Sequence, residues 1–452
     1  MSIQLPDAFV TRMKGQLGPE AELFLRTMEE PPVRGLRLNA WKKTDISGID
    51  GVTDPVPWEK NGWYLSAESG AGATVLHEAG AFYIQDPSAM IPAAVLNAQP
   101  GETILDLCAA PGGKSTQIGL AMSGKGLLIS NEPVLSRATV LSGNIERMGI
   151  TNAVVTCAWP EQLASKWGSA FDGVIADAPC SGEGMFRKDL HARQEWSEEH
   201  ARGCAKRQRE ILESAAKLVC PGGRLVYSTC TWNPAENEDT VNAFLNTHPE
   251  FSLQPFELPG IDGSGGMFTC YPHQTRGEGQ YTALMVRLGN GEKARLQPDT
   301  SLIPITAAER KLLGEFLETA GENVYRLGDR LISTALCPDI RGIRTLRTGV
   351  HLGSFRGKTL IPDHAAARAI TGIRPLRTCE LTADEALRYL SGETLPREIK
   401  GWTAVCREGM ALGWAKGSDG MLKNHYPKGL RRSHLIPETA ALNSQEYGKA
   451  GE

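Results

Sequence analysis

The segment ETILDLCAAPGGKSTQIGLAMSG, residues 102–124, sets the pattern for the middle of the chain. Its start, ETILDLCA at 102–109, is an apolar run with the length of a buried strand. The turn that follows contains Gly112 and Gly113, and KSTQIGLAMSG at 114–124 reads as a helix that ends at a glycine. A strand, a glycine-rich turn and a helix in this order are typical of an α/β sheet that binds a nucleotide or a nucleoside-containing cofactor.

The same alternation of strands and helices continues through residues 73–289. Further strand-like runs are GLLISNEP (126–133), NAVVTC (152–157), FDGVIADAP (171–179) and GGRLVYSTC (222–230). Helical stretches such as 136–149 and 199–219 separate them. This pattern predicts right-handed crossovers and a doubly wound, mostly parallel, Rossmann-like α/β sheet. Because ligands of such sheets bind beyond the carboxyl ends of the strands, the turns after these strands should meet at one site.

The GGKST end of the first turn also has the look of the phosphate loop of an ATPase or GTPase. That pattern requires a further glycine five positions before Gly113, and this position holds Cys108. A phosphate-loop NTPase therefore stays an alternative that the remaining motifs do not support.

The rest of the chain divides into smaller units. Residues 1–72 form a small N-terminal α+β unit, and residues 290–301 read as a polar linker rich in turn formers. We expect an intermediate region at 302–378 and a small β module at 379–452, where short strand-like pieces are separated by glycines.

Charge is distributed unevenly along the chain. Residues 1–289 carry 24 Lys+Arg against 33 Asp+Glu, whereas residues 290–452 carry 24 against 19. A basic C-terminal third on an acidic body indicates a polyanionic partner. A solvated surface with a chance imbalance explains the same numbers equally well.

The cysteines and the apolar runs indicate the compartment. Ten cysteines occur without any C-x-x-C pair, which argues against a zinc site and against a disulfide framework. No apolar run approaches the ~20 residues of a membrane helix, and the N-terminus lacks the pattern of a secretion signal. We therefore expect free thiols, no metal, no membrane contact and a place in a reducing cytoplasm.

Two strand ends carry the residues of greatest chemical interest. FDGVIADAPCSGEGMF (171–186) ends an apolar strand with Asp177 and Cys180, and GGRLVYSTC (222–230) ends another strand with Cys230. Enzymes that methylate exocyclic amines often carry Asp/Asn-Pro-Pro and an aromatic residue at the first of these points. A cysteine there instead suggests chemistry at a ring carbon.

Such chemistry needs a thiol, because carbon 5 of cytosine is too weak a nucleophile to accept a methyl group directly. A thiolate that adds to carbon 6 pushes electron density onto carbon 5, and a base must later remove the proton from carbon 5 before the thiolate leaves. Asp177 could orient the base through its exocyclic amine and ring nitrogen 3. A free thiol has a pKa of ~8.5, so the site must lower the pKa of the nucleophile.

Residues 80–287 resemble the RNA 5-methylcytidine methyltransferases of the NOL1/NOP2/Sun family. The resemblance lies in QDPSAM (85–90), DLCAAPGGKS (106–115), NEP (131–133), DAPCSGEGMFRK (177–188), YSTCT (227–231) and YPHQTRGEGQYTALMVR (271–287). The block at 391–432 is similar to the PUA-like module of the bacterial members that modify small-subunit ribosomal RNA. The resemblance implies a class I methyltransferase fold, S-adenosylmethionine as cofactor, and RNA, specifically 16S rRNA of the small ribosomal subunit, as partner.

The resemblance also implies a role for each candidate residue. Cys230 matches the nucleophile, Cys180 the thiol that resolves the covalent adduct, Asp177 the aspartate beside the target base, and Lys114 an active-site lysine. The residues matched to the cofactor are Cys108, Ala109, Ala110, Pro111, Gly112, Gly113, Lys114, Glu132, Arg137 and Asp177. Glu132 is also expected on the ribose because it ends a strand 20 residues after Gly112.

One position departs from the family pattern. An acidic residue usually follows the third strand near the cofactor's adenine, and this chain has Ala158 and Trp159 there. A backbone carbonyl or Glu161 could replace it.

Basic runs in the C-terminal region suit contacts to RNA phosphates. Residues 341–358 hold six basic residues (His351 among them) and residues 423–432 hold five (His425 among them). We expect the N-terminal unit and the module at 379–452 to bind RNA, and the protein to be a monomer. The alternatives are the same chemistry on tRNA, or a non-catalytic RNA-binding or ribosome-assembly factor with a methyltransferase fold.

Overall fold

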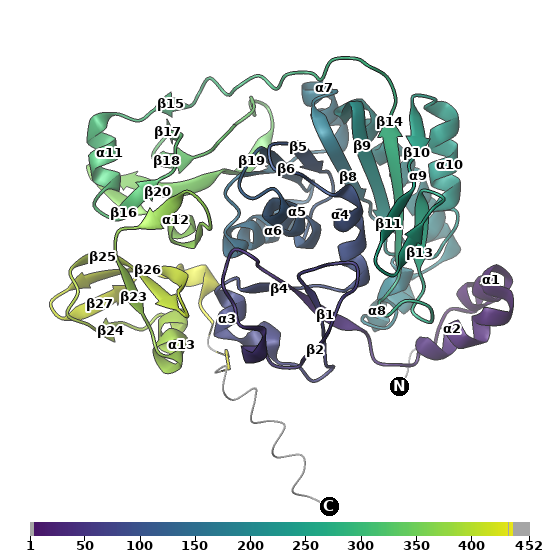
Figure 1. The fold of residues 1–452 in the computed structure, drawn as a ribbon, viewed down its shortest axis with the longest axis horizontal. Helices are drawn as coiled ribbons and strands as arrows, with labels where there is room; N and C mark the ends of the chain where they lie inside the picture. Colours follow the sequence, from purple (N-terminus) through teal and green to yellow (C-terminus); the bar gives the residue numbers. More distant parts are fainter. Residues whose placement is uncertain (1–3, 433, 437–452) are drawn as a thin grey trace, which may run out of the picture.

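The computed structural model describes residues 4–432 and 434–436, and its centre is one large mixed sheet (Figure 1). Five parallel neighbours form its middle: β9 (Val219–Thr229), β8 (Phe171–Asp177), β5 (Thr103–Asp106), β6 (Leu127–Asn131) and β7 (Ala153–Cys157). Antiparallel strands extend both edges: β10 (Phe251–Leu253), β13 (Met267–Cys270) and β14 (Gln280–Arg287) beside β9, and β19 (Arg344–Thr348) beside β7. The strand order reverses its direction of growth at β5, so the expectation of a doubly wound, mostly parallel α/β sheet is confirmed.

Helices cover both faces of this sheet because neighbouring residues of each buried strand point to opposite sides. Helices α4 (Ile91–Leu96), α5 (Gly113–Ala121) and α6 (Leu135–Met148) share one apolar core with Ile104 of β5. Helices α7 (Pro160–Trp167), α9 (Glu198–Leu218) and α10 (Glu238–Thr247) share the other with Leu105, the next residue of the same strand.

The N-terminal part contributes two helices and a second sheet. Helices α1 (Asp7–Leu17) and α2 (Ala21–Thr27) pack on Phe186 and Trp232 of the central region. The sheet has the order β2 (Val52–Pro55), β3 (Gly62–Leu65), β1 (Arg34–Leu38) and β4 (Phe82–Ile84). Its last strand therefore lies ten residues or more beyond the boundary expected at residue 72.

The C-terminal part forms two further sheets. The first has the order β15 (Ile303–Pro304), β17 (Val324–Leu327), β18 (Arg330–Ser333), β20 (Val350–Arg356) and β21 (Thr359–Pro362). The second has the order β23 (Thr378–Glu380), β25 (Gly401–Arg407), β26 (Met410–Ser418), β27 (Met421–Asn424) and β24 (Leu395–Pro396). Helices α11 (Ala307–Leu313), α12 (His364–Arg368) and α13 (Ala383–Ser391), with the pair β16 (Leu317–Ala320) and β22 (Ile373–Pro375), complete it.

These parts are joined by shared cores and by the main sheet itself. Strand β19 comes from the expected intermediate region at 302–378 and pairs with β7, with Arg344 opposite Cys157. The apolar core around Phe82 of the N-terminal sheet includes Leu412 and Tyr389 from the C-terminal module. The expected units are thus not independent of one another, because each buries apolar surface on its neighbours. Within the described residues no helix has both the length and the apolar character that crossing a membrane requires.

Candidate active site

The carboxyl ends of the parallel strands surround a cavity of about 750 Å³. Seven of the residues predicted to be catalytic or to bind the cofactor line it: Cys108, Ala110, Glu132, Arg137, Asp177, Cys180 and Cys230. Their turns follow β5, β6, β8 and β9, so the convergence expected from parallel strands is what the structure shows.

The other residues expected at the cofactor do not line this cavity but shape the turn below it. They are Ala109, Pro111, Gly112, Gly113 and Lys114. Gly112 has a φ of 116° and lies against α6, where a Cβ atom would approach Leu141 Cδ1 to 3.2 Å. The Asn144 amide donates a hydrogen bond of 2.9 Å to the Pro111 carbonyl, which fixes this turn to the same helix.

The two thiols lie next to each other. The Sγ atoms of Cys180 and Cys230 are 3.2 Å apart, and both side chains are half-buried between their two strand ends. The hydrogen bond to Cys230, together with burial, raises the pKa of Cys180 well above its ordinary value. Cys180 is therefore a neutral thiol in the free protein. Burial likewise raises the pKa of Cys108, which argues against a reactive role for that thiol.

A charged pair lies across the same turn. Lys114 Nζ is 2.8 Å from Asp177 Oδ2, and Asp177 Oδ1 accepts a hydrogen bond of 2.6 Å from the Ser228 hydroxyl and one of 3.4 Å from the Gln280 amide. Burial by itself would lower the pKa of Lys114, but the charge and the hydrogen bond of Asp177, together with the charge of Asp106, outweigh it and raise this pKa. The lysine is thus held as a cation and the carboxylate is held in one orientation.

Glu132 and Arg137 line another wall of the cavity. The Glu132 carboxylate is buried, accepts a hydrogen bond of 3.0 Å from the Val134 backbone nitrogen, and lies 3.3 Å from the Arg137 guanidinium. Arg137 also donates a hydrogen bond of 3.2 Å to the Ala110 carbonyl. This arginine therefore connects the strand-end carboxylate to the glycine-rich turn.

The chain is similar to known proteins over nearly its whole length. Three family profiles match the chain: 16S rRNA methyltransferase RsmB/F over residues 93–286, the N-terminal domain of 16S rRNA methyltransferase RsmF over 5–87, and the methyltransferase RsmF PUA domain over 376–432. The Ribosomal RNA small subunit methyltransferase F of Shewanella loihica is 31% identical over 99% of this chain and 100% of its own length. The protein of that name from Cronobacter sakazakii is 32% identical over 96% and 98%.

This chain belongs to the ribosomal RNA small subunit methyltransferase F family. The resemblance noted from the sequence motifs is thereby confirmed. A solved methyltransferase homologue from Pyrococcus horikoshii is similar over 63% of this chain and 96% of its own, with 26% identity and a TM-score of 0.55. NSun6 from the same organism, solved with SFG, shares the fold at 20% identity and a TM-score of 0.55, over 64% of this chain and 100% of its own.

In this member of the methyltransferase F family, several residues of the site were not predicted from the sequence. They are Ser228 and Gln280 beside Asp177, the cavity residues Arg207, Glu210 and Ile211 from α9, and the buried pair Gln208 and Glu236. Ser228 stands two residues before Cys230 in the YSTC motif, which is a usable signal. Nothing in the sequence pattern marks the residues of α9, because their position depends on how that helix packs.

The departure from the family pattern after β7 leaves an aromatic side chain at the cavity. Trp159 lines it with 58% of its surface exposed, and Glu161 lies on the same wall. This chain thus offers an indole face at the position where the family pattern has an acidic side chain.

Proposed function

We propose that this protein transfers a methyl group from S-adenosylmethionine to carbon 5 of a cytidine in small-subunit ribosomal RNA, through a covalent adduct between Cys230 and carbon 6. The observation that supports this most is the contact of the Cys180 and Cys230 sulfur atoms at 3.2 Å, in a cavity that Asp177 also lines. Two thiols and a carboxylate at one strand edge match the needs of thiol addition followed by elimination.

The cavity residues fit an adenosyl cofactor. Glu132 offers a buried carboxylate at the end of the second parallel strand, the position that accepts ribose hydroxyls in nucleotide-binding sheets. Trp159 offers an aromatic face to the adenine, and the turn at Cys108 and Ala110 offers a close backbone approach. When bound, S-adenosylmethionine supplies an electrophilic methyl group.

The first step assigned to this chain is addition of the Cys230 thiolate to carbon 6. The new carbon–sulfur bond places electron density on carbon 5, which then accepts the methyl group while still carrying its hydrogen. Asp177, held by Lys114 and Ser228, orients the exocyclic amine and ring nitrogen 3, and the Lys114 cation offsets charge that develops on the ring.

The second step is removal of the proton from carbon 5, which we assign to Cys180. Its neighbour Cys230 keeps Cys180 protonated in the free protein. Once the Cys230 sulfur is bound to carbon it carries no negative charge, so it no longer opposes ionisation of Cys180. Cys180 then loses its proton to water, which can reach its half-buried side chain. The Cys180 thiolate then takes the proton, the carbon–sulfur bond breaks, and Cys230 leaves as a thiolate.

RNA contacts are assigned to the N-terminal unit and to residues 379–432 of the C-terminal module, in keeping with the profiles that match them. Not every basic residue of the run at 341–358 is available to contact RNA phosphates. Arg347 is buried and bonded to Glu146, and Arg341 is paired with Asp339 at 2.9 Å. The positive charge available to phosphates is therefore smaller than the sequence indicates.

The test separates the two thiols. Incubation of Cys180→Ala with small-subunit ribosomal RNA and cofactor should yield a protein–RNA adduct that survives a denaturing gel. Cys230→Ala should yield none, and Ser136→Ala, on the exposed start of α6, is the matched control.

The reverse pattern, an adduct with Cys230→Ala alone, overturns the assignment of roles. Bisulfite mapping of the RNA product tests the position of methylation. Modification of tRNA with no change in ribosomal RNA would replace the proposed substrate.

A further inference from the structure

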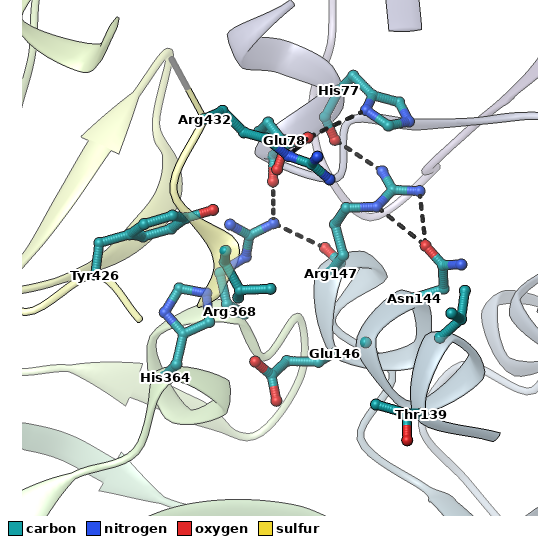
Figure 2. A pocket seen from close by; sticks show the side chains of 13 residues that line it. His77, Glu78, Thr139, Asn144, Glu146, Arg147, His364, Arg368, Tyr426 and Arg432 are labelled. Atoms are coloured by element: carbon teal, nitrogen blue, oxygen red, sulfur yellow. Dashed lines mark hydrogen bonds and ion pairs between the residues drawn. The ribbon is translucent and has the colours of Figure 1, made fainter. Parts of the chain in front are cut away.

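A second cavity, of about 350 Å³, lies where the N-terminal unit, the central sheet and the C-terminal module meet (Figure 2). We call it the junction pocket. Its walls are α3 (Val75–Glu78), α6, α12 and the segment after β27, with Tyr426 and Arg432. The side chains labelled in Figure 2 come from all of these elements and face a common space.

Positive charge is in excess around the junction pocket. Its lining contains three arginines, Arg147, Arg368 and Arg432, against the two carboxylates of Glu78 and Glu146. Two further cations lie directly behind the wall. The Arg347 guanidinium is hydrogen-bonded to the Glu146 carboxylate, and the Lys42 ammonium donates a hydrogen bond of 3.4 Å to the Arg147 carbonyl.

Neither of the two inner arginines forms an ion pair with a carboxylate of the described residues, although the charge of Glu78 acts on both and that of Glu146 acts on Arg368. Arg368 is 3% exposed and donates to the carbonyls of Leu412, Glu78 and Arg147, while its buried Nε atom has no partner. Arg147 donates to two backbone carbonyls and to the Asn144 side chain. Backbone carbonyls carry only partial negative charge, so these contacts orient the guanidinium groups without cancelling their charge.

The cations also repel one another. Burial, together with the charge of Arg368, lowers the pKa of Arg147 to about 10. Burial and the charges of both arginines lower the pKa of Lys42 well below its ordinary value. An anion in the junction pocket would relieve this repulsion, and guanidinium groups pair best with carboxylate or phosphate oxygens.

The junction pocket is connected to the turn below the candidate active site. Asn144 accepts hydrogen bonds from Arg147 and donates one of 2.9 Å to the carbonyl of Pro111. Gly112, the next residue, packs against the same helix. Two hydrogen bonds therefore connect Arg147, and any ligand that it holds, to the glycine-rich turn.

We propose that the junction pocket binds a phosphate, and that the phosphate belongs to the backbone of the substrate RNA. The proposal rests on the proposed function for the choice of RNA, whereas the affinity for phosphate follows from the pocket itself. It accounts for a basic pocket at which three parts of the chain meet, since a phosphate there would bridge all three. A phosphate held in the junction pocket would also fix the position of the RNA relative to the candidate active site, through a contact that does not depend on the base sequence.

Gly143 allows a test that leaves the structural arginines in place. It lies on the exposed side of α6 at the junction pocket, and a Cβ atom there meets nothing within 4 Å. Gly143→Glu places a carboxylate at the pocket, and Gly143→Lys places a cation of similar size. Gly265→Glu is the matched control, because Gly265 is an exposed glycine of the turn before β13 with equally open space, in a part of the chain to which no RNA contact is assigned.

The full-length proteins are titrated with a small-subunit ribosomal RNA fragment by fluorescence anisotropy, and with S-adenosylmethionine by calorimetry. We expect Gly143→Glu to weaken RNA binding about 5-fold or more at low salt, as one repulsive charge a few ångströms from a phosphate does. Gly143→Lys should bind RNA at least as well as the unaltered protein. Gly265→Glu should match the unaltered protein, and cofactor affinity should stay constant throughout.

Equal RNA affinity of Gly143→Glu and Gly265→Glu overturns the proposal, and so does equal weakening by Gly143→Glu and Gly143→Lys. Titration with inorganic phosphate separates the two sources of the ligand. Loss of phosphate binding in Gly143→Glu with unchanged RNA affinity assigns the junction pocket to a free phosphate and overturns the RNA assignment. If the unaltered protein methylates no RNA, the proposed function fails; if it does and Gly143→Glu binds RNA normally, only the pocket assignment fails.

Discussion

Glu236 holds Ser181, the residue next to Cys180. The two oxygen atoms of its buried carboxylate accept hydrogen bonds from the Ser181 backbone nitrogen, at 2.9 Å, and from the Ser181 hydroxyl. Gln208 donates to the same carboxylate at 2.9 Å. The loop that carries Cys180 is thereby tied to the loop that follows Cys230, and this tie explains why the two sulfur atoms meet.

Substitution of this carboxylate should affect stability and the release of the adduct together. Glu236→Ala leaves the Ser181 amide without an acceptor and removes one of the two acceptors of the Gln208 amide, so we expect a loss of about 1–3 kcal/mol in the free energy of unfolding. It should also slow adduct release, because Cys180 is no longer held against Cys230. Urea denaturation and the denaturing-gel assay measure the two effects. Glu236→Gln keeps an acceptor, and a Gln variant as defective as the Ala variant would contradict this explanation.

The Lys114–Asp177 pair should act on the rate of methyl transfer rather than on cofactor affinity. Lys114→Met and Asp177→Asn should each lower kcat about 100-fold or more, since each removes an oriented group that stabilises charge on the base. Single-turnover transfer of a labelled methyl group measures this. Lys125→Met, on an exposed turn, is the control. A large rise in the cofactor Kd with unchanged kcat would place the pair at the cofactor instead.

Trp159 should carry a measurable share of the cofactor affinity if its indole stacks on the adenine. Stacking of a base on an aromatic side chain contributes roughly 1–3 kcal/mol, so Trp159→Ala should weaken cofactor binding about 5- to 100-fold, and Trp159→Phe far less. Calorimetry measures both. Should Glu161→Gln cause the larger loss, the acidic side chain is the one that recognises the adenine.

Asp106 should make stability depend on pH. Burial raises its pKa to about 7, so the folded protein binds this proton more tightly than the unfolded chain, whose aspartates titrate near ~3.9. The resulting stabilisation is present below about pH 4 and is lost as the pH rises through about 7. Relative to Asp106→Asn, the unaltered protein should lose up to about 4 kcal/mol of unfolding free energy over this range. If the urea midpoints of the two proteins change with pH in the same way between about pH 4 and pH 8, Asp106 is not the source of the pH dependence.

A fragment that ends at residue 289 should be unstable, although the sequence places a boundary there. It lacks β19, which pairs with β7 along the edge of the main sheet, and it lacks the apolar partners of Phe82. We expect a lower melting temperature and aggregation through the exposed edge of β7. Circular dichroism and light scattering test this. A fragment that melts like the full chain would show that the shared cores contribute little.

The sequence by itself determined the sheet and which strand ends meet at the site. Apolar strands that alternate with helices allow few arrangements, and parallel strands must bring their carboxyl ends to one edge. Cys180 and Cys230 could therefore be placed together across 50 residues, and Glu132 could be placed at the same edge of the sheet. Motifs of this kind are local, and their positions follow from the direction of the strand that carries them.

Only the tertiary structure decided how the parts of the chain depend on one another. The pairing of β19 with β7, the hold of Glu236 on Ser181 and the junction pocket all join residues distant in sequence. Such contacts arise when apolar faces of separate elements pack and buried polar groups find partners, and both outcomes depend on the packed geometry of the whole chain. No local pattern specifies that geometry, so no inspection of the motifs reveals it.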